Sequence, residues 1–192
     1  STDATPRILE EYSKKFDNLT VLRNESNIYA GESRTRGLMA AKGQYVHFID
    51  ADDFVVSNSY EKLYKIASEN DLDWLKTTCE GVDDATGETV PNRLYDLRDV
   101  DKWLDEKLLD FVRFPKKFFD IAVVPWNGIY KREFLMNNQI RFNNLFCVND
   151  SSFYITVCVK GKRMMVTRVP FVKHRVNVGG SLVGKRAQHF DC

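Results

Sequence analysis

The sequence lacks several features that would assign a function class directly. No stretch approaches about 18 consecutive apolar residues, so the sequence predicts no membrane-spanning helix. The first residues, STDATPRILEEYSKKFD, are polar and charged and do not resemble a signal peptide. The charges nearly cancel, with 28 Lys and Arg against 27 Asp and Glu. A net charge of +1 gives no electrostatic reason to expect duplex nucleic acid or an anionic membrane as the main partner.

Cysteine is also scarce. Cys79, Cys147, Cys158 and Cys192 show no CxxC or other spacing typical of metal ligands. Four cysteines in 192 residues do not form the framework of a disulfide-stabilised domain either. We therefore expect buried free thiols in a reducing compartment, which fits an intracellular, cytoplasmic protein.

The composition that is present is typical of a globular α/β domain. Hydrophobic residues make up 43% of the chain and aromatic residues 12%, and 192 residues are enough to bury a real core. No repeat, low-complexity tract or linker interrupts the sequence, so we expect a single domain over residues 1–192. Helix and strand patterns alternate over residues 1–80, which predicts a mainly parallel central sheet with helices on both faces.

Hydrophobic periodicity and end signals locate the individual elements. Thr5-Pro6 is typical of a helix start, and Lys42-Gly43 of a helix end. Helices are expected over 6–16, 32–42, 57–70, 97–111, 131–138 and 150–159. Strands are expected over 19–22, 45–49, 74–78 and 163–169.

The run Asp50-Ala51-Asp52-Asp53 is the most informative tetrapeptide. It directly follows the apolar strand predicted over 45–49, at the end of a strand where open α/β sheets bind ligands. Three carboxylates so close together repel one another unless a cation or hydrogen-bond donors share the site, and oxygen ligands suit Mg²⁺ or Mn²⁺ bound to phosphate. The alternative is that they only cap the next helix or form a polar turn. Phosphatases with an aspartate nucleophile also carry Asp-x-Asp, but usually with Thr or Val where Phe54 stands here.

Several motifs in order resemble family 2 glycosyltransferases. They are STDATPRILEEY, AGESRTRGLMAAKGQYVHFIDADDF, VPWNGIYKREFLMNNQIRF and RFNNLFCVNDSSFYI, and the match is weakest over 80–120. The resemblance implies the GT-A fold of nucleotide-diphospho-sugar transferases. Residues 1–80 would be the remainder of the nucleotide-binding half, and 81–192 the acceptor-side half and C-terminal tail. It also implies a strand–helix–strand unit ahead of residue 1, so we expect an exposed sheet edge beside the site.

The resemblance assigns the donor side of the site. Asp50 would hydrogen-bond the ribose or base side of the nucleotide, and Asp52 would hold Mn²⁺ or Mg²⁺ on the diphosphate. That cation would offset the charge on the leaving nucleoside diphosphate. Arg34 would face the nucleotide or its phosphates, because guanidinium geometry suits phosphate. The alternatives for Arg34 are a solvated helix residue and a contact made instead by Arg36.

The resemblance also assigns the acceptor side. Asp150 would be the general base that takes the proton of the acceptor hydroxyl in an inverting reaction, because a sugar hydroxyl is a poor nucleophile. The alternative is that Asp150 only caps the helix predicted over 150–159. Trp126 would offer an apolar face to a donor or acceptor sugar, or else pack in the core. His174 would contact donor, acceptor or metal, or else serve as a structural hydrogen-bonding residue.

Three positions depart from the family pattern. Thr35 stands where Asn is usual, Gly128 where Lys is common, and Asn149 where the pattern has Glu before Asp150. The function implied is transfer of a sugar, with UDP as the expected carrier, to a carbohydrate or glycolipid acceptor in surface polysaccharide synthesis, with peripheral association at the inner face of a membrane. The alternative is a non-catalytic or truncated relative that binds nucleotide, sugar or a partner without turnover.

Overall fold

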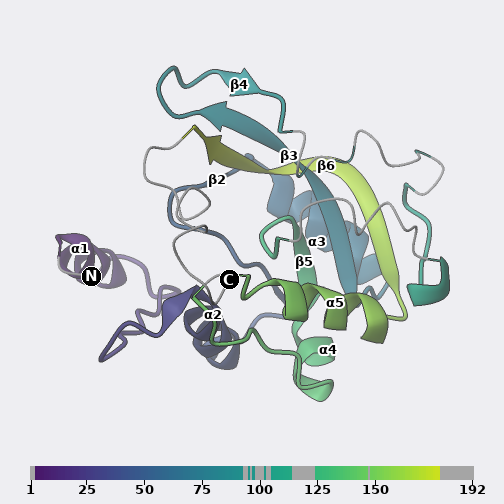
Figure 1. Cartoon of the computed structure of the whole chain (residues 1–192), viewed down its shortest axis with the longest axis horizontal. Coiled ribbons are helices and arrows are strands. Elements are labelled where there is room, and N and C mark those ends of the chain that lie inside the picture. Colours follow the sequence, from purple (N-terminus) through teal and green to yellow (C-terminus); the bar gives the residue numbers. More distant parts are fainter. Residues whose placement is uncertain are drawn as a thin grey trace.

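The fold is a six-stranded sheet with helices packed on it, seen in a computed structural model that describes residues 3–92, 95, 97, 102, 105–113, 124–146 and 148–177. The helices are α1 (Thr5–Ser13), α2 (Tyr29–Ala40), α3 (Ser59–Glu69), α4 (Arg132–Asn137) and α5 (Ser151–Lys160), with a 3-10 turn η2 (Phe111–Arg113). The strands are β1 (Tyr45–Val46), β2 (Phe54–Val55), β3 (Trp74–Asp83), β4 (Thr89–Val90), β5 (Gly128–Lys131) and β6 (Met164–Val176). Figure 1 shows β3 and β6 side by side at the centre.

The direction of the strands corrects the predicted sheet. The order is β1-β5-β3-β6-β2, with β4 attached to β3. Among the described strands only β3 and β6 pair in parallel, whereas every other pair is antiparallel. The prediction of a mainly parallel sheet is therefore wrong, and the sheet is mixed. Two of the four antiparallel pairs involve β5, a four-residue strand too short to show a two-residue period, which inserts between β1 and β3. The other two pairs involve the two-residue strands β2 and β4, which were not predicted.

The prediction of helices on both faces of the sheet is confirmed, because consecutive residues of one strand belong to two different buried clusters. Trp74 and Met164 belong to one buried cluster, and the next residues, Leu75 and Met165, belong to the other. Successive strand side chains point to opposite faces, so each face of the sheet carries its own core. The first cluster includes residues of α2, α4 and α5, and the second includes residues of α3. Figure 1 shows α5 in front of the sheet and α3 behind it.

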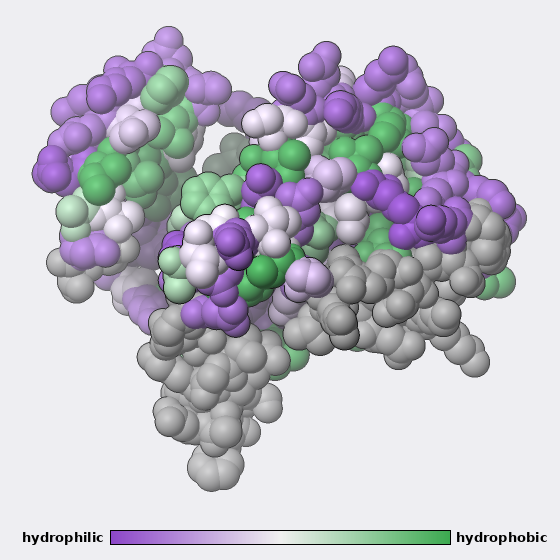
Figure 2. Space-filling model, turned by 90° about the horizontal axis from the view of Figure 1, so that it is seen from above, coloured by the Kyte–Doolittle hydropathy of each residue, from purple (hydrophilic) through white to green (hydrophobic). Residues whose placement is uncertain are grey.

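The N-terminal segment is the least buried part of the described chain. Helix α1 has no buried residue, and its apolar residues Ile8, Leu9 and Tyr12, together with Phe16 just after the helix, are all exposed. The strand predicted over 19–22 does not form, because no described strand pairs with this run, and Leu22 is 45% exposed. Figure 2 shows apolar surface on the α1 side of the molecule, with an open gap between α1 and the rest.

The remaining predictions differ in outcome. The five described α-helices begin and end within about three residues of five predicted ranges. Most of the helix predicted over 97–111 lies outside the described residues. The strand predicted over 45–49 pairs only at Tyr45 and Val46, and β1 is an edge strand of the described sheet, as expected beside the acidic run. No helix in the described ranges is both long and apolar enough to cross a membrane.

Candidate functional site

The acidic run forms a tight turn where the chain leaves the sheet. Phe48 is buried in the core, so the next residues emerge at the surface at a fixed place. The backbone N–H of Asp53 donates to the carbonyl oxygen of Asp50 at 3.2 Å and closes the turn before β2 begins. Asp52 is exposed, and the side chain of Asp50 is 42% exposed. Both carboxylates can therefore be reached by a ligand from solvent.

Arg34 of α2 reaches this turn and joins it to a distant segment. Its Nη2 donates to Asp50 Oδ1 at 2.5 Å, and its Nη1 donates to Asn149 Oδ1 at 3.1 Å. The Arg34 side chain is only 17% exposed. Arg36 instead bonds the Arg23 carbonyl oxygen and the Asn24 side chain. Of the two arginines, Arg34 is thus the one that faces the acidic turn.

Close packing of α2 on the loop over 142–146 sets the position of Arg34. A Cβ atom on Gly31 would lie 2.1 Å from the Asn143 carbonyl oxygen, so only glycine permits this approach. The Phe142 backbone N–H donates to Thr35 Oγ1 at 3.2 Å. The hydroxyl of Thr35, at a position where the family pattern has Asn, therefore helps to hold the two segments together.

Asp150 opens α5 next to this contact. Its carbonyl oxygen accepts the first helical hydrogen bond, from the Tyr154 N–H at 2.9 Å, but its side chain makes no capping hydrogen bond. The alternative in which Asp150 acts as a side-chain cap is not supported. Burial raises the pKa of Tyr130, and among the smaller influences Asp150 raises that pKa while Arg34 lowers it. Both charged groups therefore lie near one buried hydroxyl.

Trp126 and His174 stack on one another. Their ring centres are 5.0 Å apart with planes at 16°, and Tyr95 packs edge-on against both. Trp126 is only 3% exposed, which favours core packing over an open sugar platform. His174 Nδ1 lies 3.1 Å from Asn92 Nδ2, so the imidazole has a structural partner on one nitrogen.

His174 and its neighbour also lie beside the acidic turn. The backbone N–H of Arg175 donates to Asp53 Oδ1 at 3.0 Å. Burial raises the pKa of Asp53, while this N–H and the nearby His174 act to lower it. Asp53 thus fastens the turn to β6, and His174 stands close to the carboxylates. A direct contact of His174 with a ligand stays a prediction.

The donor set fits a cation that is completed by a ligand's phosphates. Among the described residues, no group of three or more His, Cys, Asp or Glu is arranged to hold an ion alone. Mg²⁺ is commonly bound through one or two carboxylates plus substrate phosphates, and Mn²⁺ also prefers oxygen ligands. The exposed Asp52 can supply such a carboxylate. The buried Oδ2 of Asp53, which has no hydrogen-bond partner, is a further unsatisfied oxygen in the same turn.

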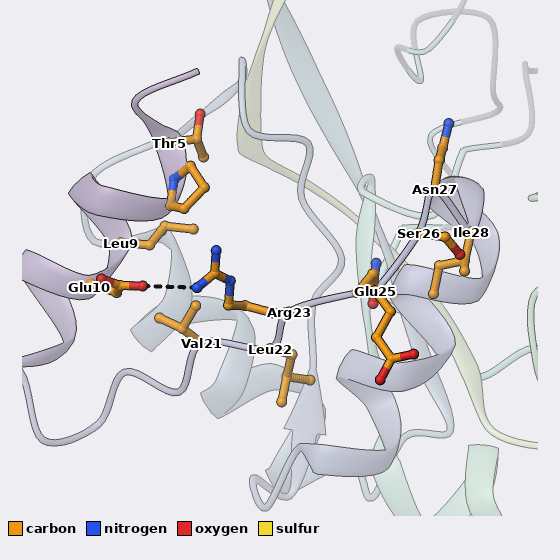
Figure 3. A pocket seen from close by; sticks show the side chains of 12 residues that line it. Thr5, Leu9, Glu10, Val21, Leu22, Arg23, Glu25, Ser26, Asn27 and Ile28 are labelled. Atoms are coloured by element: carbon orange, nitrogen blue, oxygen red, sulfur yellow. Dashed lines mark hydrogen bonds and ion pairs between the residues drawn. The ribbon is translucent and has the colours of Figure 1, made fainter. Parts of the chain in front are cut away.

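A separate cavity lies between α1 and the segment 21–28. Its volume is about 670 Å³, and an ion pair of Arg23 with Glu10 at 3.2 Å crosses one side of it (Figure 3). None of the predicted site residues lines it. Its position identifies no further chemistry, so the candidate site remains the region around Arg34, Asp50 and Asp150.

Sequence reasoning missed two supporting residues. Asn149 is noticed in the sequence only as a departure from a pattern, and its role as a partner of Arg34 depends on long-range packing. His47 bonds the Trp126 carbonyl oxygen through Nε2 at 2.8 Å and the Tyr60 hydroxyl through Nδ1 at 3.0 Å. Burial lowers the pKa of His47 to about 4, so it is neutral and fixes the end of the strand that leads to Asp50.

Comparisons with known proteins give a consistent result. The model of the family described as "Glycosyl transferase family 2" matches residues 1–154. A poly(ribitol-phosphate) beta-glucosyltransferase of Bacillus spizizenii is 27% identical over 180 residues, covering 88% of this chain and 28% of that protein. An uncharacterized glycosyltransferase of Escherichia coli, YibD, is 31% identical over 148 residues, or 74% of this chain and 40% of that one.

Among solved structures, residues 1–349 of Staphylococcus aureus TarS in complex with UDP-GlcNAc superimpose with a TM-score of 0.75 at 23% identity. The match covers 95% of this chain and 49% of that structure, and at this identity it shows the shared GT-A fold alone. The chain therefore spans less than half the length of each of these three proteins.

Proposed function

Because the chain belongs to glycosyl transferase family 2, we propose that it transfers a sugar from a UDP-sugar to a carbohydrate or lipid-linked acceptor. Surface polysaccharide synthesis is the proposed setting, since the Bacillus spizizenii relative is a glucosyltransferase that acts on poly(ribitol phosphate). UDP is the proposed carrier because the TarS structure of the same fold was solved with UDP-GlcNAc.

The donor side consists of Arg34, Asp50 and Asp52. Asp50 accepts hydrogen bonds from the ribose or base side, and the Arg34 guanidinium beside it holds its carboxylate in place. Asp52, exposed next to it, would hold Mn²⁺ or Mg²⁺ against the diphosphate. When bound, the ion would stabilise the negative charge that develops on the leaving diphosphate. Trp126 is buried, so we give it a packing role near the donor side and no direct contact with a sugar.

Asp150 supplies the proposed base. Its carboxylate takes the proton of the acceptor hydroxyl while the hydroxyl oxygen bonds to the anomeric carbon of the donor sugar. At the same time the bond from that carbon to the diphosphate oxygen breaks, and UDP departs with the bonding electrons. Attack from the side opposite the leaving group inverts the configuration. A positioned base of this kind contributes roughly 10²- to 10⁴-fold to the rate.

The observation that carries the proposal is the Arg34 bridge. One side chain contacts both the acidic turn at Asp50 and the residue before Asp150, so the donor and acceptor residues gather in one region from three separate segments. The test is UDP-sugar hydrolysis or transfer by the wild type, Asp52→Ala and Asp150→Ala. Loss of activity in both variants is expected, and activity that survives both changes would contradict the proposal.

The second candidate is a relative that binds UDP or sugar without turnover. It is favoured by Asn149, which stands where the family pattern has Glu. UDP binding by the wild type with no hydrolysis or transfer for any UDP-hexose would support it.

Location is part of the same proposal. Cys158 is a buried free thiol, in keeping with the reducing environment of a cytoplasmic protein. A lipid-linked acceptor would be presented at the inner face of a membrane, so we propose peripheral association there. Co-flotation with vesicles that carry a lipid-linked acceptor is expected, and equal recovery with and without vesicles would contradict it.

A further inference from the structure

The Arg34 guanidinium is shared by two partners of different chemistry. Asp50 Oδ1, at 2.5 Å, is an anion, whereas Asn149 Oδ1, at 3.1 Å, is a neutral amide oxygen. Asn149 is 8% exposed and the Arg34 side chain is 17% exposed, whereas the Asp50 side chain is 42% exposed, so solvent screens the contact with Asn149 less than the contact with Asp50. Within the described part, no hydrogen bond joins Asp50 directly to Asn149.

Asn149 is itself held in one orientation. Its Nδ2 donates to the Leu145 carbonyl oxygen at 3.5 Å, which leaves Oδ1 toward Arg34. Its Cβ lies 3.0 Å from where a Cβ on Gly31 would stand, so α2 packs tightly against it. The Asn149 amide can therefore hold Arg34 Nη1 in place, and because it carries no charge it does not compete with Asp50 for the guanidinium.

We propose that Asn149 is a positioning residue that holds Arg34 on Asp50. Through Arg34, the carboxylate on the donor side keeps a fixed place relative to Asp150, the residue that follows Asn149. Glu at position 149 would pair with Arg34 as a second anion and draw it away from Asp50. The consequence for UDP binding rests on the proposed function, whereas the link itself is a property of the protein without ligand.

The link is tested without ligand by urea unfolding. Asn149→Ala and Asp50→Asn are made singly and together, and again with Arg34→Met. Residues that do not touch are expected to act additively unless a third residue joins them. We expect Asn149→Ala to lower the urea midpoint at most half as much when Asp50→Asn is present, and we expect this coupling to vanish with Arg34→Met. If the shifts in the urea midpoint caused by Asn149→Ala and Asp50→Asn are additive in the protein that keeps Arg34, the proposal is overturned.

The chain offers a matched control and a fallback. Asn144 is an exposed asparagine in the same loop, and Asn144→Ala is expected to be additive with Asp50→Asn. If Asn149→Ala does not fold, Asn149→Ser takes its place, because serine fills part of the space and lacks the reach to Arg34.

The consequence for function is tested by titrating UDP with Mn²⁺. Asn149→Ala should raise the Kd of the folded protein for UDP about three- to tenfold, because Asn149 acts on UDP only through Arg34 and part of the free energy of its hydrogen bond is expressed in binding. With Arg34→Met present, Asn149→Ala should raise it no further. Asn149→Glu should also weaken UDP binding. If Asn149 has only a structural role, Asn149→Ala should lower the melting temperature and leave the Kd for UDP unchanged, and that result would overturn the positioning role. Absence of UDP binding by the wild type would refute the proposed function. The urea unfolding experiment would then still test whether Asn149 holds Arg34 on Asp50.

Discussion

Replacing Lys76 with Met should make the protein more stable at neutral pH. Lys76 lies on β3 and is fully buried, and its Nζ has no hydrogen-bond partner. Two aromatic rings lie near it, with Nζ 5.3 Å from the centre of the Tyr154 ring and 6.0 Å from that of Trp74. Burial lowers the pKa of Lys76 from 10.5 to about 8, with smaller opposite effects from Cys79 and Cys158.

The size of the effect follows from the two pKa values. Each unit of difference between the folded and unfolded pKa corresponds to about 1.4 kcal/mol, so the charged Lys76 costs about 3 kcal/mol below pH 8. The aromatic rings return about 1 kcal/mol as cation–π attraction. Met has a similar length and no charge, so Lys76→Met should raise the free energy of unfolding by about 2 kcal/mol at pH 7.

The pH dependence has a definite sign. Between pH 8 and 10.5 the unfolded chain keeps the lysine proton while the folded chain has lost it, so the cost falls as the pH rises. The advantage of Lys76→Met over the wild type should therefore be about 1 kcal/mol smaller at pH 9 than at pH 7. Cys158, whose pKa burial raises to about 12, stays protonated in the folded state and affects both proteins alike.

Urea unfolding at pH 7 and pH 9 measures this directly. Lys62→Met, at an exposed position on α3, is the control and should change stability by less than about 0.5 kcal/mol. A Lys76→Met variant less stable than the wild type at pH 7, or an advantage that does not shrink by pH 9, would refute the reasoning.

Three further predictions concern the site and its supports. Gly31→Ala should cost about 1–3 kcal/mol in urea unfolding, because its Cβ would meet the Asn143 carbonyl oxygen at 2.1 Å; an unchanged midpoint would contradict the packing. The pKa of His47 falls from 6.5 to about 4 on folding, so the unfolded chain takes up a proton first as the pH drops. Between pH 7 and pH 5 the free energy of unfolding of the wild type should therefore fall by about 2 kcal/mol more than that of His47→Gln, as measured by urea unfolding at both pH values. An equal fall in the two proteins would argue against a neutral His47. Asp150→Asn should lower kcat at least about 10²-fold and leave the Kd for UDP within about twofold, whereas a matching loss of UDP affinity would show that Asp150 serves the donor instead.

The sequence was sufficient for features that depend on neighbouring residues. The helix starting at Thr5-Pro6 and the acidic turn after a buried strand are both where local pattern predicts them. Cys79 and Cys158 are buried, as expected. Arg34 lies on Asp50, a contact that the sequence did not predict, and its role toward a nucleotide stays a prediction.

Features that depend on long-range pairing could not be predicted. The four residues of β5 carry too short a pattern to reveal a strand, yet they form both antiparallel pairs that lie between β1 and β3. The run over 19–22 has the composition of a strand but no described partner. Gly128 became intelligible only from the structure, because a Cβ there would lie 2.6 Å from the Leu75 carbonyl oxygen across the β3–β5 pair.

The most direct test of the central claim is a calorimetric titration of UDP into the wild type and Asp52→Asn, each with Mn²⁺ and with EDTA. We predict that the wild type binds UDP only when Mn²⁺ is present and that Asp52→Asn loses most of this metal-dependent affinity. UDP binding that is equal in all four titrations, or absent from the wild type at millimolar UDP, would contradict a nucleotide-sugar site at Asp50 and Asp52.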